Sequence, residues 1–442
     1  MPRHALAVSS IIAICVITYL PAVDNSFISD DFGLFPMLEA LEQNPAYIFE
    51  APSELFRVMS YVYFWLCFKA FGMTPEPFYW AGIALHIVVS SLVYALVLKT
   101  TSRWLAAFAA ATFFAAYERH QEAVMWISAA NETVLTLNCL LFLILWDRAI
   151  WADKESRAMT FVAFSVFVLA LFSKEAAVVL LPLAILMLVM KGATAVDIAR
   201  KSLPLVIIVL AFAAFWLSQS NRNFFITDGH YAPGLHFFPV YFRSLLRLVT
   251  PLLPLTLVFV FFKWRAPNSL LFWATLLVLS IAPYSFLTYL DHIPSRNTYW
   301  PSVGLAGMIG VLVSSLYSSL KTEHAKRAVI LSFCIVVAAN VSYIWIKKEP
   351  QYRERAAPTR ELIATLNSRN WRKTTTLPLV VCGFPLHPWV FSEAVARFTD
   401  FDQTEVVLGN ACETTGEVTV LRWDQATMRY VAGIEPATAS SR

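Results

Sequence analysis

Residues 5–35 read ALAVSSIIAICVITYLPAVDNSFISDDFGLF and hold the two features from which we interpret this chain. The first is an uncharged apolar run, 5–22, close to the ~20 residues that a helix needs to cross a bilayer. The second is the adjacent pair Asp30 and Asp31. Two neighbouring carboxylates repel each other and are costly beside a low-dielectric membrane, so their presence there indicates chemistry. A solvated turn or a helix N-cap stays open as the simpler explanation, because Asp favours both.

The composition of the whole chain is that of a membrane protein. Of its 442 residues, 58% are hydrophobic and only 14% are charged, and the mean hydropathy is +0.60. A soluble domain has roughly a quarter of its residues charged. We therefore expect an all-α polytopic membrane protein with about eleven transmembrane helices. The expected spans are 5–22, 78–98, 103–117, 124–146, 158–172, 175–190, 203–218, 241–262, 269–288, 299–318 and 328–346.

Two apolar segments have more than one interpretation. The first run follows Arg3 like a signal peptide, but no small-residue cleavage site follows it, so we interpret it as an anchor. Residues 56–71, FRVMSYVYFWLCFKAF, predict an aromatic helix at the headgroup level, as do residues 31–42. A re-entrant segment or a true span is the alternative for 56–71.

Basic residues predict the orientation in the membrane. If the N-terminus is cytoplasmic, every loop on that side carries Lys or Arg, as the positive-inside rule requires. These residues are Arg3, Lys99, Arg103, Arg148, Lys154, Arg157, Lys191, Arg200, Lys201, Lys263, Arg265, Lys321, Lys326 and Arg327. Lys347 and Lys348 argue the other way. The outer loop 23–77 and the tail 347–442 then lie on the non-cytoplasmic face, in a bacterial periplasm or an ER lumen.

The tail has a different composition from the rest of the chain. A charged connector that leads into a helix is followed by four β-type runs, LPLVVCGF, TEVVLGN, EVTVLRW and MRYVAG. We therefore divide the chain into a transmembrane domain, 1–346, and a small soluble α+β domain, 347–442. Cys382 and Cys412 can pair there if the compartment is oxidising, and two unpaired buried thiols are the alternative.

Signals for soluble cofactors or nucleic acid are missing from the sequence. We find no phosphate-cradling glycine loop, no dinucleotide fingerprint and no Cys-x-x-Cys spacing. The net charge of +4 is unremarkable and indicates no nucleic-acid partner.

Polar residues gather at the predicted outer face. They comprise Glu118, Arg119, His120 and Glu122 in one turn, Glu132 in the next run, Lys174 in SKE, Arg296 in RNTYWPS, and His86 within the second span. Each also has an ordinary explanation. Arg119 and Glu122 are spaced as a helix ion pair, His86 can bond a neighbouring helix, and Lys174 can extend its ammonium to the interface.

Five motifs in order resemble the GT-C superfamily of polytopic glycosyltransferases, in particular protein O-mannosyltransferase-like enzymes and transmembrane proteins with C-terminal tetratricopeptide repeats. The resemblance covers roughly 10–345. The motifs are FRVMSYVYFWLCFKAFG (56–72), ALHIVVSSLVYALVL (84–98), YERHQEAVMWISAANE (117–132), LFSKEAAVVLLPL (171–183) and SRNTYWPSVGLA (295–306). Val58 stands where proline is usual, Ala130 replaces an arginine, and the repeat array is absent.

This resemblance implies inverting transfer of a sugar, by family default mannose, from a polyprenyl-phosphate carrier to a hydroxyl of a protein, glycan or lipid. Asp30 is then the general base, and Asp31 orients the acceptor or helps position a cation. Arg296, Lys174 and Arg119 are implied as ligands of the donor phosphate. The implied substrate-binding residues are His120, Glu122, Arg57, Glu132, Tyr299 and His86. A divalent metal is left open, because members of the superfamily differ.

Two other functions fit a polytopic chain with a soluble tail. A transporter or flippase of lipid-linked sugars is one, although we find no internal repeat and the ionisable residues gather near one surface instead of the midplane. A scaffold of a cell-envelope assembly is the other. Convergence of Asp30, Arg296 and His120 on one cavity would distinguish an enzyme from a scaffold.

Overall fold

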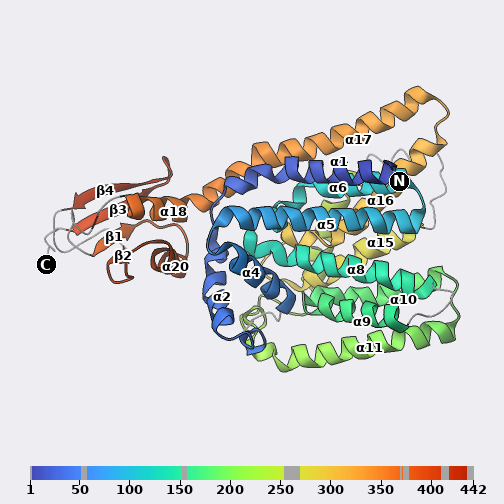
Figure 1. Ribbon diagram of the computed structural model, residues 1–442, viewed down its shortest axis with the longest axis horizontal. Helices are drawn as coiled ribbons and strands as arrows, with labels where there is room; N and C mark the ends of the chain where they lie inside the picture. The colour runs from blue at the N-terminus through green and yellow to red at the C-terminus, as the bar shows by residue number, and fades with distance from the viewer. Residues whose placement is uncertain are drawn as a thin grey trace.

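The computed structural model describes residues 2–50, 57–151, 157–252, 269–368, 371, 378–409 and 418–435. A bundle of helices carries a small domain at one end, and the N-terminus lies at the other end (Figure 1). The α-helices are α1 Pro2–Tyr19, α2 Leu34–Gln43, α3 Tyr47–Glu50, α4 Val58–Phe71, α5 Pro75–Thr101, α6 Trp104–Ala116, α7 Gln121–Met125, α8 Asn131–Trp151, α9 Arg157–Leu171, α10 Leu180–Met190, α11 Ala195–Ser218, α12 Phe224–Thr227, α13 Phe237–Val249, α15 Ser269–Ile281, α16 Pro301–Ser319, α17 Glu323–Tyr343, α18 Glu349–Ser368 and α20 Pro388–Phe398.

Short 3-10 turns join these helices, and one π turn extends α17. The 3-10 turns are η1 Leu20–Asp24, η2 Ser29–Gly33, η3 Glu118–His120, η4 Ile127–Ala130, η5 Glu175–Val179, η6 Ser220–Arg222, η7 Thr250–Leu252, η8 Ala282–Phe286 and η9 Arg296–Thr298, and the π turn is η10 Ile344–Lys348.

Seven helices of the described residues are long and apolar enough to cross a membrane, which fits the expected polytopic fold. They coincide with seven of the expected spans. The expected spans 103–117, 158–172 and 175–190 form shorter apolar helices, and so does α4. The expected span 241–262 extends into residues outside the described part, so the count of about eleven stays a prediction.

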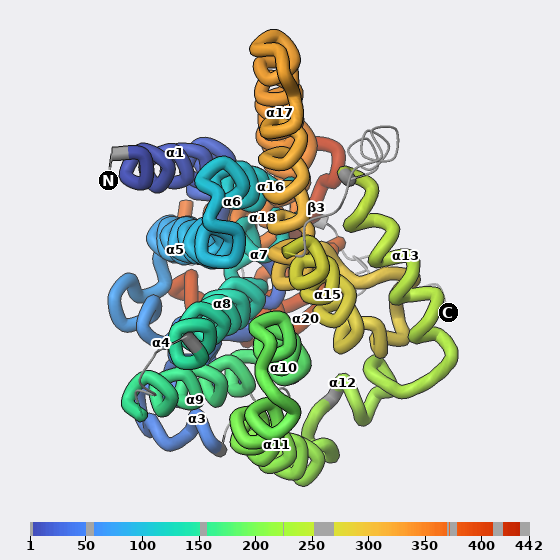
Figure 2. The backbone as a smooth tube through the Cα atoms, turned by 90° about the vertical axis from the view of Figure 1, so that its right-hand side faces the viewer, coloured from blue at the N-terminus to red at the C-terminus, as the bar shows by residue number. Residues whose placement is uncertain are grey.

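Glycines on α16 set the packing at the centre of the bundle. A Cβ on Gly310 would lie 2.2 Å from the carbonyl oxygen of Ala106 on α6, and one on Gly304 would lie 2.5 Å from the amide nitrogen of Leu277 on α15. Only glycine allows these backbones to approach so closely, as is usual between membrane helices. Figure 2 shows α16 within the bundle and α17 at its edge.

The chain between α6 and α8 does not form the single span that we expected from residue 124. Trp126 has an extended backbone, with φ −130° and ψ 114°, which ends α7. Helix α8 begins only at Asn131, after the η4 turn. This broken segment leaves Trp126 and Ser128 outside α8, and both line a cavity described below.

The basic loops meet at the opposite end of the bundle. Asp147 at the end of α8 pairs with Lys99 at the end of α5, at 2.7 Å, and with Lys191 after α10. Arg103 donates to Ser315 of α16. Lys99, Arg103 and Lys191, which we expected on one side of the membrane, therefore share one end of the fold.

The C-terminal domain is a four-stranded sheet with helices, as the sequence predicts. Its strands are β1 Leu379–Cys382, β2 Val406–Gly409, β3 Val418–Asp424 and β4 Arg429–Glu435. Their order is β2-β1-β3-β4, with β1 parallel to β2 and β3 and with β3 antiparallel to β4. Cys382 is buried at the end of β1, whereas Cys412 lies outside the described residues. The disulfide therefore stays a prediction.

Helix α20 joins this domain to the first turns of the bundle. The Phe398 ring lies 5.7, 5.4 and 5.5 Å from the rings of Phe27, Phe32 and Phe35, centroid to centroid. Beside this cluster, Arg397 pairs with Glu39 of α2. The turn with the two aspartates is thus held between the bundle and the C-terminal domain.

We predict that Phe398→Ala loosens this turn. Three aromatic contacts are lost, each worth roughly 0.5–1.5 kcal/mol. Amide hydrogen exchange in residues 26–35 should therefore become faster by about tenfold or more. Tyr430→Ala is the matched control, because the Tyr430 ring packs on Trp423 of the same domain. Equal exchange in both variants would show that the Phe398 cluster does not hold the turn.

Candidate active site

A cavity of about 980 Å³ opens at the end of the bundle that carries the C-terminal domain. Its walls come from η2, α2, the start of α4, the segment around η4, η9 and the first turn of α20. The lining residues are Asp30, Gly33, Leu34, Pro36, Met37, Tyr47, Arg57, Ser60, Tyr61, Phe64, Trp126, Ser128, Ala129, Asn131, Phe225, His230, Tyr289, Arg296 and Trp389. A neighbouring cavity of about 70 Å³ shares Arg57 and Arg296 and reaches Lys174.

The two adjacent aspartates have different environments. Asp30 is exposed on the cavity wall, where its carboxylate accepts a 3.2 Å hydrogen bond from Ser29 and no other from the described residues. Ser29 has a φ of +41°, a left-handed backbone conformation that costs of order 1–3 kcal/mol in a residue other than glycine. Strain of this kind is concentrated at functional sites, so it supports the assignment of Asp30 to the site.

Asp31 instead holds the turn together from inside. Its side chain is fully buried. One carboxyl oxygen accepts from the backbone N–H of Ile28 at 2.8 Å, and the other accepts from the backbone N–H of Ser128 at 2.7 Å and from the Ser128 hydroxyl. Burial raises the pKa of the Asp31 carboxyl to about 7, and the hydrogen bonds from Ser128 and Ile28 only partly oppose this.

Two arginines face the same cavity as Asp30. Arg296 donates its backbone N–H to Glu122 at 3.0 Å, and its guanidinium lies 3.5 Å from Glu122 and over the Trp126 ring. Arg57 is the N-cap residue just before α4, and its buried Nε has no hydrogen-bond partner among the described residues. A guanidinium of this kind can bind a phosphate with two parallel hydrogen bonds.

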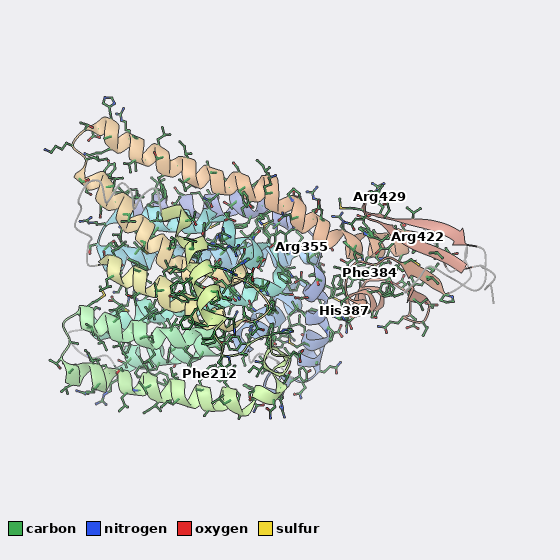
Figure 3. All side chains as sticks on the ribbon, turned by 180° about the vertical axis from the view of Figure 1, so that it is seen from behind. Phe212, Arg355, Phe384, His387, Arg422 and Arg429 are labelled. Atoms are coloured by element: carbon green, nitrogen blue, oxygen red, sulfur yellow. The ribbon has the colours of Figure 1, made fainter. Side chains whose placement is uncertain are left out.

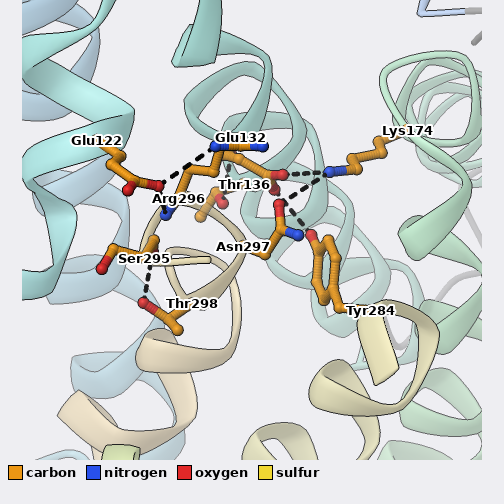
Figure 4. Close-up of polar contacts among 9 residues, drawn as sticks. All are labelled: Glu122, Glu132, Thr136, Lys174, Tyr284, Ser295, Arg296, Asn297 and Thr298. Atoms are coloured by element: carbon orange, nitrogen blue, oxygen red, sulfur yellow. Dashed lines mark hydrogen bonds and ion pairs between the residues drawn. The ribbon is translucent and has the colours of Figure 1, made fainter. Parts of the chain in front are cut away.

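Lys174 and Glu132 form a buried ion pair beside the arginines (Figure 4). Lys174 also donates to Asn297 at 3.3 Å, and the other oxygen of Glu132 accepts from the Tyr284 hydroxyl at 2.8 Å. Burial of both charges is tolerated because each has a partner. Lys174 therefore does not extend to the interface, and its charge is already balanced.

The two histidines and Tyr299 meet in a buried network away from the cavity wall. His86 contacts the Tyr299 hydroxyl at 2.6 Å and the Ala115 carbonyl at 3.1 Å, and His120 contacts the Ser302 hydroxyl at 2.6 Å. This fits the simpler explanation of His86 as a bond between helices. Asp30 and Arg296 therefore share one cavity, whereas His120 does not line it.

Arg119 and Glu122 do not pair with each other. The nearest carboxylate to Arg119 is Glu118, at 3.3 Å, and Glu122 bonds Arg296 instead. The substrate roles that the resemblance implies for Glu122, Glu132, Tyr299 and the histidines stay predictions.

Some cavity residues were not predicted from the sequence. Ser128 lies inside a motif that we quoted, but nothing marked it as the partner of Asp31. Trp389 comes from the tail, and no local pattern predicts that it reaches this cavity. Within the described ranges, no three His, Cys, Asp or Glu side chains gather as a metal site.

The helical fold is similar to that of solved GT-C glycosyltransferases. One of the solved structures that the chain resembles is ArnT from Cupriavidus metallidurans bound to undecaprenyl phosphate, with a TM-score of 0.56, 11% identity and coverage of 95% of this chain and 94% of ArnT. Its apo state matches with a TM-score of 0.52, 11% identity and coverage of 95% and 93%.

An archaeal oligosaccharyltransferase has the same fold. AglB from Archaeoglobus fulgidus, in complex with an inhibitory peptide and a dolichol-phosphate, matches with a TM-score of 0.50 and 12% identity over 94% of this chain and 65% of AglB. At these identities the likeness concerns the fold alone. No family model matches the sequence, and no curated protein does.

We predict that Asp31 makes stability depend on pH. The folded state binds a proton at Asp31 up to about pH 7, whereas the unfolded chain releases it near the ordinary aspartate pKa of 3.8. The contribution of this group is therefore full below pH 4 and is lost as the pH rises through 7, by on the order of 4 kcal/mol. Asp31→Asn should flatten the change in unfolding temperature between pH 5 and 8.

Asp30→Asn is the matched control for this measurement, because Asp30 is exposed. Its unfolding temperature should change between pH 5 and 8 as much as that of the wild type. If Asp31→Asn also shows the wild-type change in unfolding temperature, Asp31 does not titrate in this range.

Proposed function

We propose that this protein transfers a sugar, mannose as the sequence resemblance implies, from a polyprenyl-phosphate carrier to an acceptor hydroxyl with inversion. One observation carries the proposal: an exposed carboxylate, Asp30, shares a cavity with two guanidinium groups, Arg57 and Arg296. A base and a phosphate site are the two groups that this reaction needs. The fold shared with ArnT, whose structure holds undecaprenyl phosphate, supports a lipid-linked donor.

In the proposed reaction, the acceptor hydroxyl transfers its proton to Asp30 as its oxygen attacks the anomeric carbon. The bond between that carbon and the phosphate oxygen breaks, and its electron pair stays on the phosphate. The leaving phosphate gains one negative charge. Arg57 and Arg296 would stabilise this charge as it develops, which lowers the barrier more than it strengthens donor binding.

The charges around the cavity favour Arg57 as the first phosphate ligand. Lys174 is balanced by Glu132, and Arg296 shares Glu122. No ion pair of Arg57 is found in the described part of the chain. Arg57 would therefore meet the donor phosphate with a full charge, and Arg296 would add a second guanidinium beside it.

We also propose that this end of the bundle is non-cytoplasmic. The basic loops around Lys99, Arg103 and Lys191 meet at the far end, and the positive-inside rule places that end in the cytoplasm. The cavity and the C-terminal domain then face a periplasm or a lumen, where the lipid-linked donor and the acceptor meet.

We predict that Asp30→Asn lowers sugar transfer by at least about a hundredfold, the usual scale for a general base. The variant keeps the side-chain shape but cannot accept the proton. Release of carrier phosphate from a panel of polyprenyl-phosphate sugars measures the effect. Asp24→Asn, exposed at the end of η1, is the control and should keep activity.

Near-normal turnover of Asp30→Asn would remove Asp30 as the base. Asp31→Asn should lose less activity per folded molecule. The reverse order would assign the base to Asp31.

We predict that transfer falls in the order wild type, Lys, Ala at both Arg57 and Arg296. Lysine keeps the charge but loses the second parallel hydrogen bond, and alanine loses both. The turnover number and the donor KM should both be measured with a polyprenyl-phosphate mannose. Arg243→Ala is the control, because Arg243 forms an exposed pair with Asp291. Equal activity across either series would exclude that arginine as a phosphate ligand.

A further inference from the structure

The C-terminal domain supplies part of the cavity wall through Trp389. The six-membered ring of Trp389 lies 3.4 Å from the position that a Cβ on Gly33 would occupy. Gly33 ends the η2 turn that carries Asp30. The indole therefore lies against the turn of the proposed base, although it comes from the other domain.

Contacts at both ends of α20 fix the position of Trp389. At the start, its backbone N–H donates to the His387 ring at 3.4 Å, and Pro388 occupies the first helical position. Figure 3 shows His387 where the C-terminal domain meets the bundle. At the far end of α20, Phe398 packs among the rings of the first turns. The position of Trp389 is thus fixed by the same contacts that fix the Asp30 turn.

A large part of the indole is left uncovered in the cavity. Trp389 is 37% exposed, whereas the other tryptophan of the wall, Trp126, is covered on one face by the Arg296 guanidinium at 5.2 Å. Tyr47, Tyr61 and Tyr289 add further aromatic groups to the wall. An exposed indole and a carboxylate in one cavity offer a ligand an apolar face and a hydrogen-bond acceptor.

A sugar ring has the matching chemistry. One face of a pyranose presents C–H groups that pack on an aromatic ring, and its edge presents hydroxyls that donate to a carboxylate. We propose that Trp389 forms the wall of an acceptor subsite that takes a sugar ring, so that the acceptor is a glycoside. This inference rests on the proposed function, because Asp30 must be the base that receives the acceptor proton.

The position of Trp389 assigns it to the acceptor and not to the donor. Trp389 contacts the turn of Asp30, and a base must touch the acceptor hydroxyl. The arginines proposed for the donor phosphate come from α4 and η9 instead. Trp389 is therefore a positioning residue, and its loss should act on acceptor binding with little effect on the donor.

The test uses the full chain in nanodiscs, with polyprenyl-phosphate mannose as donor. The acceptor probes are the octyl glycosides of α-mannose, β-glucose and β-galactose, and a Ser/Thr-rich peptide. Trp389→Leu should raise the KM for the accepted glycoside about tenfold, as expected for loss of one aromatic contact. The donor KM and the donor hydrolysis without acceptor should not change. Trp389→Phe, which keeps an aromatic face, should stay within about threefold of wild type.

Trp80→Leu is the matched control, because Trp80 is a 39% exposed indole on α5, away from the cavity and the C-terminal domain. It should leave all constants unchanged. Saturation-transfer NMR of the same glycosides adds a readout that needs no turnover, and Trp389→Leu should lose the signal. A glycoside KM unaffected by Trp389→Leu, a rise in the donor KM instead, or transfer to the peptide alone overturns the inference.

The outcomes separate this inference from the proposed function. If the wild type releases carrier phosphate from no donor, the proposed function fails. The NMR comparison still decides on Trp389: a glycoside signal that disappears in Trp389→Leu supports the subsite, and equal signals or none in the wild type exclude it.

Discussion

The buried carboxyl of Asp31 is the contact on which the site depends. It accepts hydrogen bonds from Ile28 in its own turn and from Ser128 in the broken segment before α8. Two parts of the chain far apart in sequence are thereby fixed to each other, and the turn keeps Ser29 in a left-handed conformation. Because Asp31 points inward, Asp30 must point outward into the cavity. One carboxylate of the pair thus serves the structure, and the other is left accessible for chemistry.

The charges around the cavity follow a similar division. Burial of Glu132 requires Lys174 beside it, since an uncompensated charge would be costly in this part of the bundle. The Glu122 carboxylate accepts from the Arg296 backbone N–H and also lies 3.5 Å from the Arg296 guanidinium. These contacts orient the guanidinium and partly neutralise its charge. Arg57 lines the same cavity without an ion pair among the described residues. A guanidinium placed there interacts more strongly with the doubly charged leaving phosphate than with the singly charged phosphodiester of the donor.

The sequence predicts those parts of this fold that follow from composition and periodicity. Long apolar runs became helices, and four β-type runs in the tail became the four strands of one sheet. Hydropathy did not predict the break at Trp126, because an apolar residue in an extended backbone looks the same as one in a helix. It also could not tell Asp30 from Asp31, since only tertiary contacts with Ser128 distinguish them. The ion pair of Lys174 with Glu132 could not be predicted either, because the two residues are distant in sequence.

The placement of Trp389 depends on rigidity over a long distance. Helices α17 and α18 form one continuous helix with the π turn between them, from Glu323 to Ser368. Trp345 on this helix donates to the carbonyl of Ile17 near the end of α1, and Thr359 further along donates to the carbonyl of Phe27 at 3.5 Å.

The C-terminal domain is therefore joined to the bundle by a helix fixed at two points and by α20 at a third. Three separated contacts allow little rotation, so a side chain from this domain can hold a wall of the cavity as firmly as one from the bundle. The proposed donor and acceptor walls thus come from different domains, and the Asp30 turn lies where these domains meet.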